Sequence, residues 1–201
     1  APEAPATPAP LPPVAEAPAL PQEPTAEKTA TSCDITLDLM PEASAMIGVT
    51  LLAPCHPDER VTLRHAGLVV TGQTTVGGAL FTGLPALDSA GKVQVTFADG
   101  AEVEATVVVP DLAGYRRFGV QWQGDDAFQI HGFEGGANYG QPGDINAVNP
   151  GRPMADAARK GGFLTILGDP ASANPLLAEI YTFPADRAAR VQVVVEAAVT
   201  E

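Results

Sequence analysis

The sequence predicts an all-β protein with two antiparallel β-sandwich units, which follow a disordered arm rich in proline and alanine. Apolar and polar residues alternate with a period of two in most segments after Cys33, as expected for strands with one buried face. Glycine, proline, aspartate and asparagine separate these segments at short intervals. One short segment, Met154 to Lys160, has the signals of a helix, because it follows Pro153 and ends at Gly161-Gly162.

Residues 1–32 form the predicted arm. Nine of the 20 prolines lie in residues 1–31, where few apolar side chains are larger than alanine. Because proline has no backbone donor, this segment cannot join a sheet, and it favours extended polyproline II conformation. We interpret the arm as a linker, with a docking arm as the alternative. Since the chain begins with Ala1, we also expect a signal peptide or a membrane anchor before it.

Residues 33–110 are predicted to form the first, small sandwich. Asp99-Gly100 predicts a hairpin whose turn has positive φ at both central residues. His65 lies on the apolar face of its strand, which predicts a buried, hydrogen-bonded side chain. His56 lies in a turn, where we expect exposure to solvent. The expected strands lie at 34–40, 46–53, 61–65, near 69, near 81, 93–97 and 103–109.

The two cysteines predict a disulfide in this first unit. Cys33 and Cys55 flank the first two expected strands, so that a bond between them would join neighbours. A closed loop of this length contributes about 3 kcal/mol through chain entropy. The alternatives are two free, buried thiols in a cytosolic protein and metal binding by the two cysteines. With the proline-rich arm, the disulfide interpretation predicts an exported protein.

Residues 111–201 are predicted to form the second β-unit, after a connector at 110–117. Residues 132–152 make a long glycine-rich loop, and long ordered loops are often functional. The chain stops directly after its last expected strand, so we expect the natural protein to continue. The expected strands lie at 118–123, 128–131, 163–167, 179–183 and 191–197.

Several short segments carry a resemblance to a known group of proteins. They are Cys33, LAPC at 52–55, VTLRHAGL at 61–68, QW at 121–122, IH at 130–131, GANYG at 136–140 and IYTFP at 180–184. Together they resemble uncharacterised alphaproteobacterial exported proteins that are often labelled "translocase". The resemblance spans most of residues 33–199, and it implies an N-terminal membrane anchor and a C-terminal extension.

A second resemblance concerns the order of elements in residues 46–109. A strand is followed by the glycine turn Gly77-Gly78, then by a strand that ends in Leu84-Pro85, and then by a hairpin. This order is similar to that of a transthyretin-like or carboxypeptidase-regulatory-like module. The similarity implies a small antiparallel sandwich.

Composition excludes several classes of function. The formal net charge is −13 at pH 7, so phosphate backbones would be repelled and we expect no nucleic-acid binding. The same charge disfavours an anionic membrane surface, so we expect membrane contact only through the missing N-terminal anchor. The sequence contains no Gly-x-Ser-x-Gly elbow, no triad signature and no P-loop. We therefore predict no cofactor and no enzymatic activity.

Three titratable residues are candidates for a metal or acid/base site, namely His131, Glu134 and Asp144. His131 and Glu134 lie where a strand enters the glycine-rich loop. Residues three apart on a strand point to opposite faces, so these two converge only if Gly132 breaks the alternation. The alternative for His131 is a solvated or hydrogen-bonded side chain without a ligand.

Aromatic and arginine side chains supply a candidate docking patch, because both types are enriched at interface hot spots. The alternative is that the rings cover hydrophobic edges of the sandwich. The candidates are Tyr115, Arg116, Arg117, Phe133, Tyr139 and Arg152.

The favoured function is that of a non-catalytic, exported protein in the periplasm. It would be tethered to the inner membrane and bind a periplasmic protein or a membrane complex. One alternative is a small-ligand or metal-binding domain, including a hydrolytic one, that uses the loop at 131–149. Another is a purely structural spacer.

Overall fold

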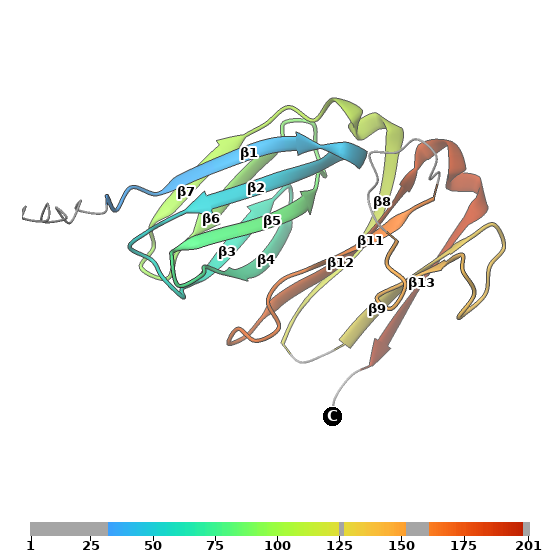
Figure 1. Cartoon of the computed structure of the whole chain (residues 1–201). Helices are drawn as coiled ribbons and strands as arrows, with labels where there is room; N and C mark the ends of the chain where they lie inside the picture. Colours follow the sequence, from blue (N-terminus) through green and yellow to red (C-terminus); the bar gives the residue numbers. More distant parts are fainter. Residues whose placement is uncertain (1–31, 125–126, 152–160, 199–201) are drawn as a thin grey trace, which may run out of the picture. The chain divides into compact units, whose positions relative to one another are not determined.

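The computed structural model describes residues 32–124, 127–151 and 161–198 (Figure 1). Within these residues the regular structure is antiparallel strands and short 3-10 helices, which confirms the predicted all-β class. Residues 1–31 of the predicted arm, the predicted helix at Met154 to Lys160 and Arg152 lie outside the described residues. Thr31–Glu201 group as one compact unit.

Two antiparallel sheets form the first sandwich. Sheet A has the order β1-β2-β5, and sheet B has the order β4-β3-β6-β7. A 3-10 helix, η1 (Ala43–Ala45), joins the first two strands. The strands of sheet A are β1 (Thr36–Glu42), β2 (Met46–Leu52) and β5 (Ala79–Pro85). Those of sheet B are β3 (Arg60–His65), β4 (Leu68–Gln73), β6 (Lys92–Thr96) and β7 (Glu102–Thr106).

Period-two alternation places the apolar side chains of both sheets in one core. Ile47 and Leu51 of β2 are fully buried, as are Val61 of β3 and Val93 of β6. Burial of one such side chain stabilises the fold by roughly 1.5–3 kcal/mol relative to exposure. His65 is also buried, with its Nδ1 donating to Lys92 O at 2.8 Å and its Nε2 accepting from Leu87 N at 2.8 Å. The prediction of a buried, hydrogen-bonded His65 is therefore confirmed.

The hairpin of β6 and β7 is confirmed, but its turn is not the predicted one. Phe97 N donates to Ala101 O, and Gly100 N donates to Phe97 O at 3.1 Å. Only Gly100 has positive φ (88°), whereas Asp99 does not. The loop therefore has three residues, with a left-handed glycine after a tight turn, which is the next most common hairpin connection.

Two further antiparallel sheets follow in the chain. Sheet C has the order β11-β12-β8, and sheet D has the order β10-β9-β13. The 3-10 helices η2 (Pro110–Gly114) and η3 (Ala185–Arg190) precede β8 and β13. The strands of sheet C are β8 (Tyr115–Gln123), β11 (Phe163–Leu167) and β12 (Leu176–Pro184). Those of sheet D are β9 (Ala127–Glu134), β10 (Asp144–Ile145) and β13 (Val191–Ala198).

Strand β12 is buried on both faces. Ala178 and Ile180 join the core of the first sandwich, while Tyr181 packs into a second cluster with Ile130 of β9. Residues 178–182 are consequently all buried, which explains why this strand reads as a nearly continuous apolar run. Sheet C thus contacts sheet B through β12 and β4 and sheet D through β12 and β9.

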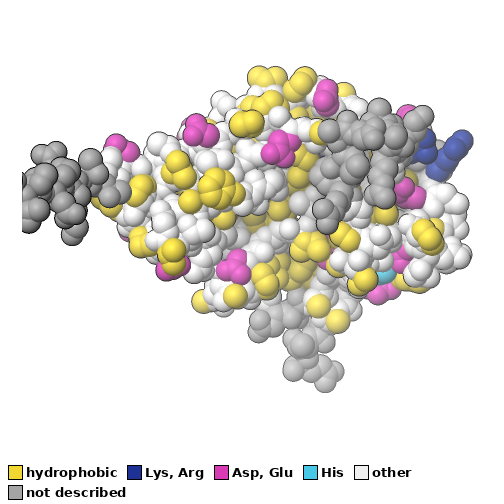
Figure 2. Space-filling view, in the orientation of Figure 1, with side chains coloured by type: hydrophobic (Ala, Val, Ile, Leu, Met, Phe, Trp, Pro, Cys, Tyr) yellow, Lys and Arg dark blue, Asp and Glu magenta, His cyan; other side chains and the backbone are white. Residues whose placement is uncertain are grey.

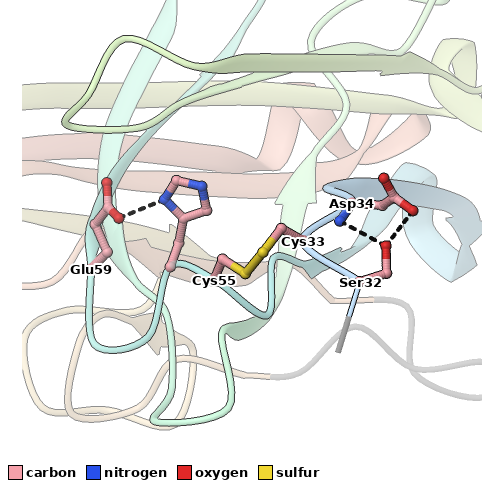
Figure 3. The surroundings of a disulfide bond; sticks show 6 residues. Ser32, Cys33, Asp34, Cys55 and Glu59 are labelled. Atoms are coloured by element: carbon pink, nitrogen blue, oxygen red, sulfur yellow. Dashed lines mark hydrogen bonds and ion pairs between the residues drawn. A yellow bond between two sulfur atoms is a disulfide. The ribbon is translucent and has the colours of Figure 1, made fainter. Parts of the chain in front are cut away.

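The predicted disulfide is confirmed between Cys33 and Cys55 (Figure 3). Their Cα atoms are 5.2 Å apart, and 22 residues separate them in sequence. Disulfides persist in oxidising compartments, so this bond indicates an exported environment. Within the described part of the chain, no helix is both long enough and apolar enough to cross a membrane.

Candidate functional site

The glycine-rich loop turns back over β9. Gly135 and Gly136 follow the strand with positive φ (62° and 81°), which glycine adopts without steric cost. The chain then returns as β10, whose Asp144 and Ile145 pair with Phe133 and Gly132 of β9. The loop therefore covers the face of β9 that carries His131 and Phe133.

A buried, hydrogen-bonded pair of side chains lies beneath this loop. His131 Nδ1 donates to Asp144 Oδ1 at 2.7 Å, and the two residues are 7% and 1% exposed. Burial alone would raise the pKa of Asp144, but hydrogen bonds from Gly140, Asn146 and His131 outweigh it and lower that pKa. The carboxylate is therefore ionised, accepts the hydrogen bond from Nδ1 and fixes the orientation of the ring.

The loop is held by its own amide groups. Asn146 Oδ1 accepts from Val148 N at 2.8 Å and from Asn149 N at 3.1 Å. Asn149 Nδ2 in turn donates to Asp144 O at 3.0 Å and to Pro142 O at 3.3 Å. These side chains act as turn formers, so the loop has a defined conformation before any ligand binds.

Three rings meet at this hydrogen-bonded pair. The His131 centroid lies 4.8 Å from that of Tyr139 and 5.7 Å from that of Phe133, and the last two are 4.9 Å apart. Phe133 is buried, whereas Tyr139 is 56% exposed. A hydrogen bond to Glu196 of β13 is the main cause that raises the pKa of the Tyr139 hydroxyl. The exposed ring packs in an edge-to-face arrangement with His131 and Phe133.

A cavity of about 520 Å³ opens beside these groups. This volume lies within the range of ligand pockets, roughly 300–1,000 Å³. Among its lining residues in the described part of the chain, none is Ser, Thr, Cys or Lys, and the titratable residues are His131, Tyr139 and Asp144. We call it the β9 loop site, defined by Gln129, His131, Tyr139, Gln141, Asp144 and Val148.

Glu134 does not join His131 and Asp144. Its Oε1 accepts from Gly162 N and from the Tyr181 hydroxyl, both at 2.6 Å, on the opposite face of β9. Gly132 does not break the alternation; instead it makes room for Tyr181, whose ring would lie 2.5 Å from a Cβ at this position. Burial raises the pKa of Tyr181 far above its usual range, and the hydrogen bond to Glu134 raises it further.

The candidate docking residues fall into two places. Phe133 and Tyr139 belong to the β9 loop, whereas Tyr115, Arg116 and Arg117 lie on β8, which begins inside the predicted connector. These three line a separate cavity of about 530 Å³ together with residues of η2. Arg116 is exposed and Tyr115 is half-buried.

Arg117 is tied to the first sandwich. Its Nη2 donates to Ser44 O at 3.0 Å and to Ala45 O at 2.7 Å, and burial lowers its pKa to about 10. Ser44 and Ala45 both have positive φ (64° and 55°), which non-glycine residues rarely adopt. Arg117 thus stabilises a strained turn.

Glu179 is a buried acid that the sequence analysis missed. It is 5% exposed, and its Oε2 accepts from Ile130 N of β9 at 2.7 Å. Desolvation is the main cause that raises the pKa of this carboxyl. The available signal was a lone acidic residue within the apolar run of β12, from Leu176 to Phe183.

In comparisons with known proteins, no family model, no curated protein and no solved structure matches this chain. Its function must therefore be inferred from its own geometry and chemistry.

Proposed function

We propose that this chain is a non-catalytic, exported β-protein that binds a protein partner through the β9 loop site. The observation that carries this proposal is an exposed aromatic side chain on a loop that is already fixed. Tyr139 is 56% exposed and Val148 is 90% exposed, and both line the same cavity as the buried His131–Asp144 pair.

The fixed loop favours binding because it has little conformational entropy left to lose. A rigid site avoids much of the ordering cost of association, which is about 0.5–1.5 kcal/mol for each immobilised side chain. Tyrosine is enriched among the residues that dominate interface energies. Figure 2 shows exposed hydrophobic side chains interspersed with acidic ones on the visible face, so a partner with apolar and basic groups would fit.

The chemistry of the site supports binding over catalysis. The described residues that line the cavity include no serine, threonine, cysteine or lysine beside the His131 imidazole. Asp144 already uses both oxygens, one for His131 and one for Gly140 N at 2.9 Å. The pair therefore serves to hold the loop on β9.

The cellular setting is also part of the proposal. The disulfide between Cys33 and Cys55 supports an oxidising compartment, and we place the protein in the periplasm. An anchor upstream of Ala1 would tether it to the inner membrane, with residues 1–32 as the spacer.

Affinity purification tests the proposal. The full product of the gene is recovered from native membranes in mild detergent, as wild type and as Tyr139→Ala. We expect a specific protein to co-purify with the wild type and to be reduced at least about tenfold with the variant, because a hot-spot ring is lost. The matched control is Phe81→Ala, which removes a ring that is 67% exposed on β5.

Two results would refute the proposed surface. One is recovery of the wild-type protein without any specific partner. The other is equal loss of the partner with Phe81→Ala, which would place binding on sheet A.

Small-ligand binding in the same cavity is the second candidate function. The cavity volume of about 520 Å³ and the His131 imidazole in its lining favour it. A ligand there would shift the NMR signals of the His131 ring and raise the melting temperature in the absence of any protein partner. Unchanged signals across a panel of small polar molecules would remove this candidate.

A further inference from the structure

Two turns meet at the end of the first sandwich that carries the disulfide. The first is the turn between β2 and β3, in which His56 directly follows Cys55 and Glu59 comes three residues later. The second is the β6–β7 turn, which contains Asp99. One ligand atom from each of His56, Glu59 and Asp99 lies within 4.8 Å of the other two.

His56 is not exposed as the sequence predicted. Its side chain is 15% exposed, and its Nδ1 lies 2.7 Å from Glu59 Oε2 (Figure 3). The ring also packs on Phe97, with centroids 4.4 Å apart. The prediction of exposure was wrong because neighbouring aromatic and acidic side chains cover a turn residue.

The first turn is fixed by Thr74, which is 1% exposed. Its Oγ1 donates to His56 O at 2.6 Å and accepts from Glu59 N at 2.8 Å. His56 and Glu59 are thereby held at fixed positions on the backbone. A metal site needs this kind of support, because poorly held ligands lose affinity.

Each carboxylate has one oxygen bound to the backbone. Glu59 Oε1 accepts from Ala98 N at 2.9 Å, and Asp99 Oδ1 accepts from Ala101 N at 2.9 Å. These bonds orient both side chains, and the bond from Ala98 N to Glu59 links the second turn to the first. The other oxygen of Glu59 faces His56, and Asp99 is exposed, so an ion can enter from solvent.

We propose that His56, Glu59 and Asp99 form a binding site for a divalent transition-metal ion, with Zn²⁺ as the best fit. One imidazole nitrogen and two carboxylate oxygens are a donor set that suits Zn²⁺, whereas Ca²⁺ and Mg²⁺ favour oxygen ligands. The two carboxylates carry the charge that a dication needs. Three protein ligands leave further positions for water.

The proposed ion would act as a structural clip. It would join the turn that contains Cys55 to the β6–β7 turn, and therefore sheet A to sheet B at the disulfide end. The site shares no residue with the β9 loop site, so it goes beyond the proposed function.

Calorimetric titration with ZnCl₂ tests the proposal on the complete 201-residue chain, free of any histidine tag and stripped by a chelator. We expect one bound ion per chain and a higher melting temperature. The NMR ring signals of His56 should shift, while those of His65 and His131 should not.

Asp99→Asn is the diagnostic variant, because an asparagine still accepts the hydrogen bond from Ala101 N but removes the ligand charge. We expect it to weaken Zn²⁺ binding at least about tenfold. The matched control is Glu104→Gln, which makes the same charge change at the Lys92–Glu104 pair (2.7 Å) and should leave Zn²⁺ affinity unchanged.

Several outcomes would overturn the proposal. They are an unmoved His56 signal up to about 1 mM Zn²⁺, equal weakening by the two variants, or tighter binding of Ca²⁺ than of Zn²⁺. Movement of the His131 signal instead would assign the ion to the β9 loop site. None of these results depends on the co-purification experiment, so the two proposals can fail separately.

Discussion

The first sandwich and the region formed by β8 to β13 have cores of different chemistry. Among the residues that the structure describes, the cluster centred on sheets A and B contains 19 buried hydrophobic residues, whereas the cluster between sheets C and D contains four. The second region also buries the ionisable side chains of His131, Asp144 and Glu179, whereas the first sandwich buries that of His65. Its packing therefore depends on directional hydrogen bonds to a much greater extent.

The two kinds of core stabilise the fold in different ways. Apolar burial is non-directional and depends mainly on the area removed from water. A buried polar network fixes side chains in one arrangement and is costly when only partly satisfied. The loop with Tyr139 and Asp144 lies on the polar region, where that rigidity positions an exposed surface.

The largest expected effect is in the apolar core. Leu51→Ala removes a fully buried side chain of β2, and we expect it to lower the free energy of unfolding by about 2–5 kcal/mol. Leu52→Ala is the control, because Leu52 is 41% exposed and surface changes usually stay within about 0.5 kcal/mol. Urea denaturation measures both, and equal losses would contradict the assignment of the core to the inner face.

Removal of the disulfide should cost about 3 kcal/mol, since the closed loop restricts the unfolded chain. The test is urea denaturation of Cys33→Ala/Cys55→Ala against the oxidised wild type. The same variant should leave the NMR ring signals of His131 unchanged, because the β9 loop belongs to the other region. A shift of those signals would show that the two regions are coupled.

A single methyl group should distinguish close packing from open space in the second half of the chain. Gly132→Ala places a Cβ 2.5 Å from the Tyr181 ring, and we expect a loss of about 1–3 kcal/mol from overpacking. Gly114→Ala is the matched control, since no atom lies within 4 Å of its Cβ. Thermal melts that show equal stability for the two variants would argue against the packing of Tyr181 on β9.

The smallest expected effect is the pH dependence that the buried acids impose. The pKa of Glu179 is raised above its ordinary 4.5, so the folded state holds this proton more tightly than the unfolded state does. Stability from this group therefore falls as pH rises from 4.5 through the raised pKa. The pKa of Asp144 is lowered, so its stabilisation is lost as pH falls from 3.8 through the lowered pKa.

Two variants separate these contributions. Glu179→Gln keeps an acceptor for Ile130 N and should remove the loss of stability as pH rises above 4.5. Asp144→Asn should remove the loss of stability as pH falls below 3.8. Urea midpoints across a pH series measure both. A Glu179→Gln profile identical to that of the wild type would show that this carboxyl does not control the pH response.

Most strands could be predicted because each buries one face, which leaves a period of two in the sequence. Strand β10 was missed because it has two residues and exists only through its pairing with β9. The β6–β7 turn type was wrong because Asp-Gly also fits a three-residue loop. Both misses depend on backbone geometry that local composition does not specify.

The candidate site was predictable only in part. His131 and Asp144 could be proposed together because both belong to the glycine-rich loop and its strand. Strand alternation already implied that Glu134 points away from His131. The role of Arg117 could not be predicted, since its acceptors Ser44 and Ala45 lie more than 70 residues earlier in the chain.

The disulfide also determines how the fold would bear a mechanical load. Thr36 of β1 pairs with Leu52 of β2, and Cys33 and Cys55 each lie three residues beyond this last pair. A force on the chain before Cys33 would otherwise peel β1 from β2 one pair at a time, like a zipper. The disulfide links the two strands at that end, so the force acts on both strands at once. A force on the chain before Cys33 therefore loads the pairs of β1 and β2 together and does not open them one after another.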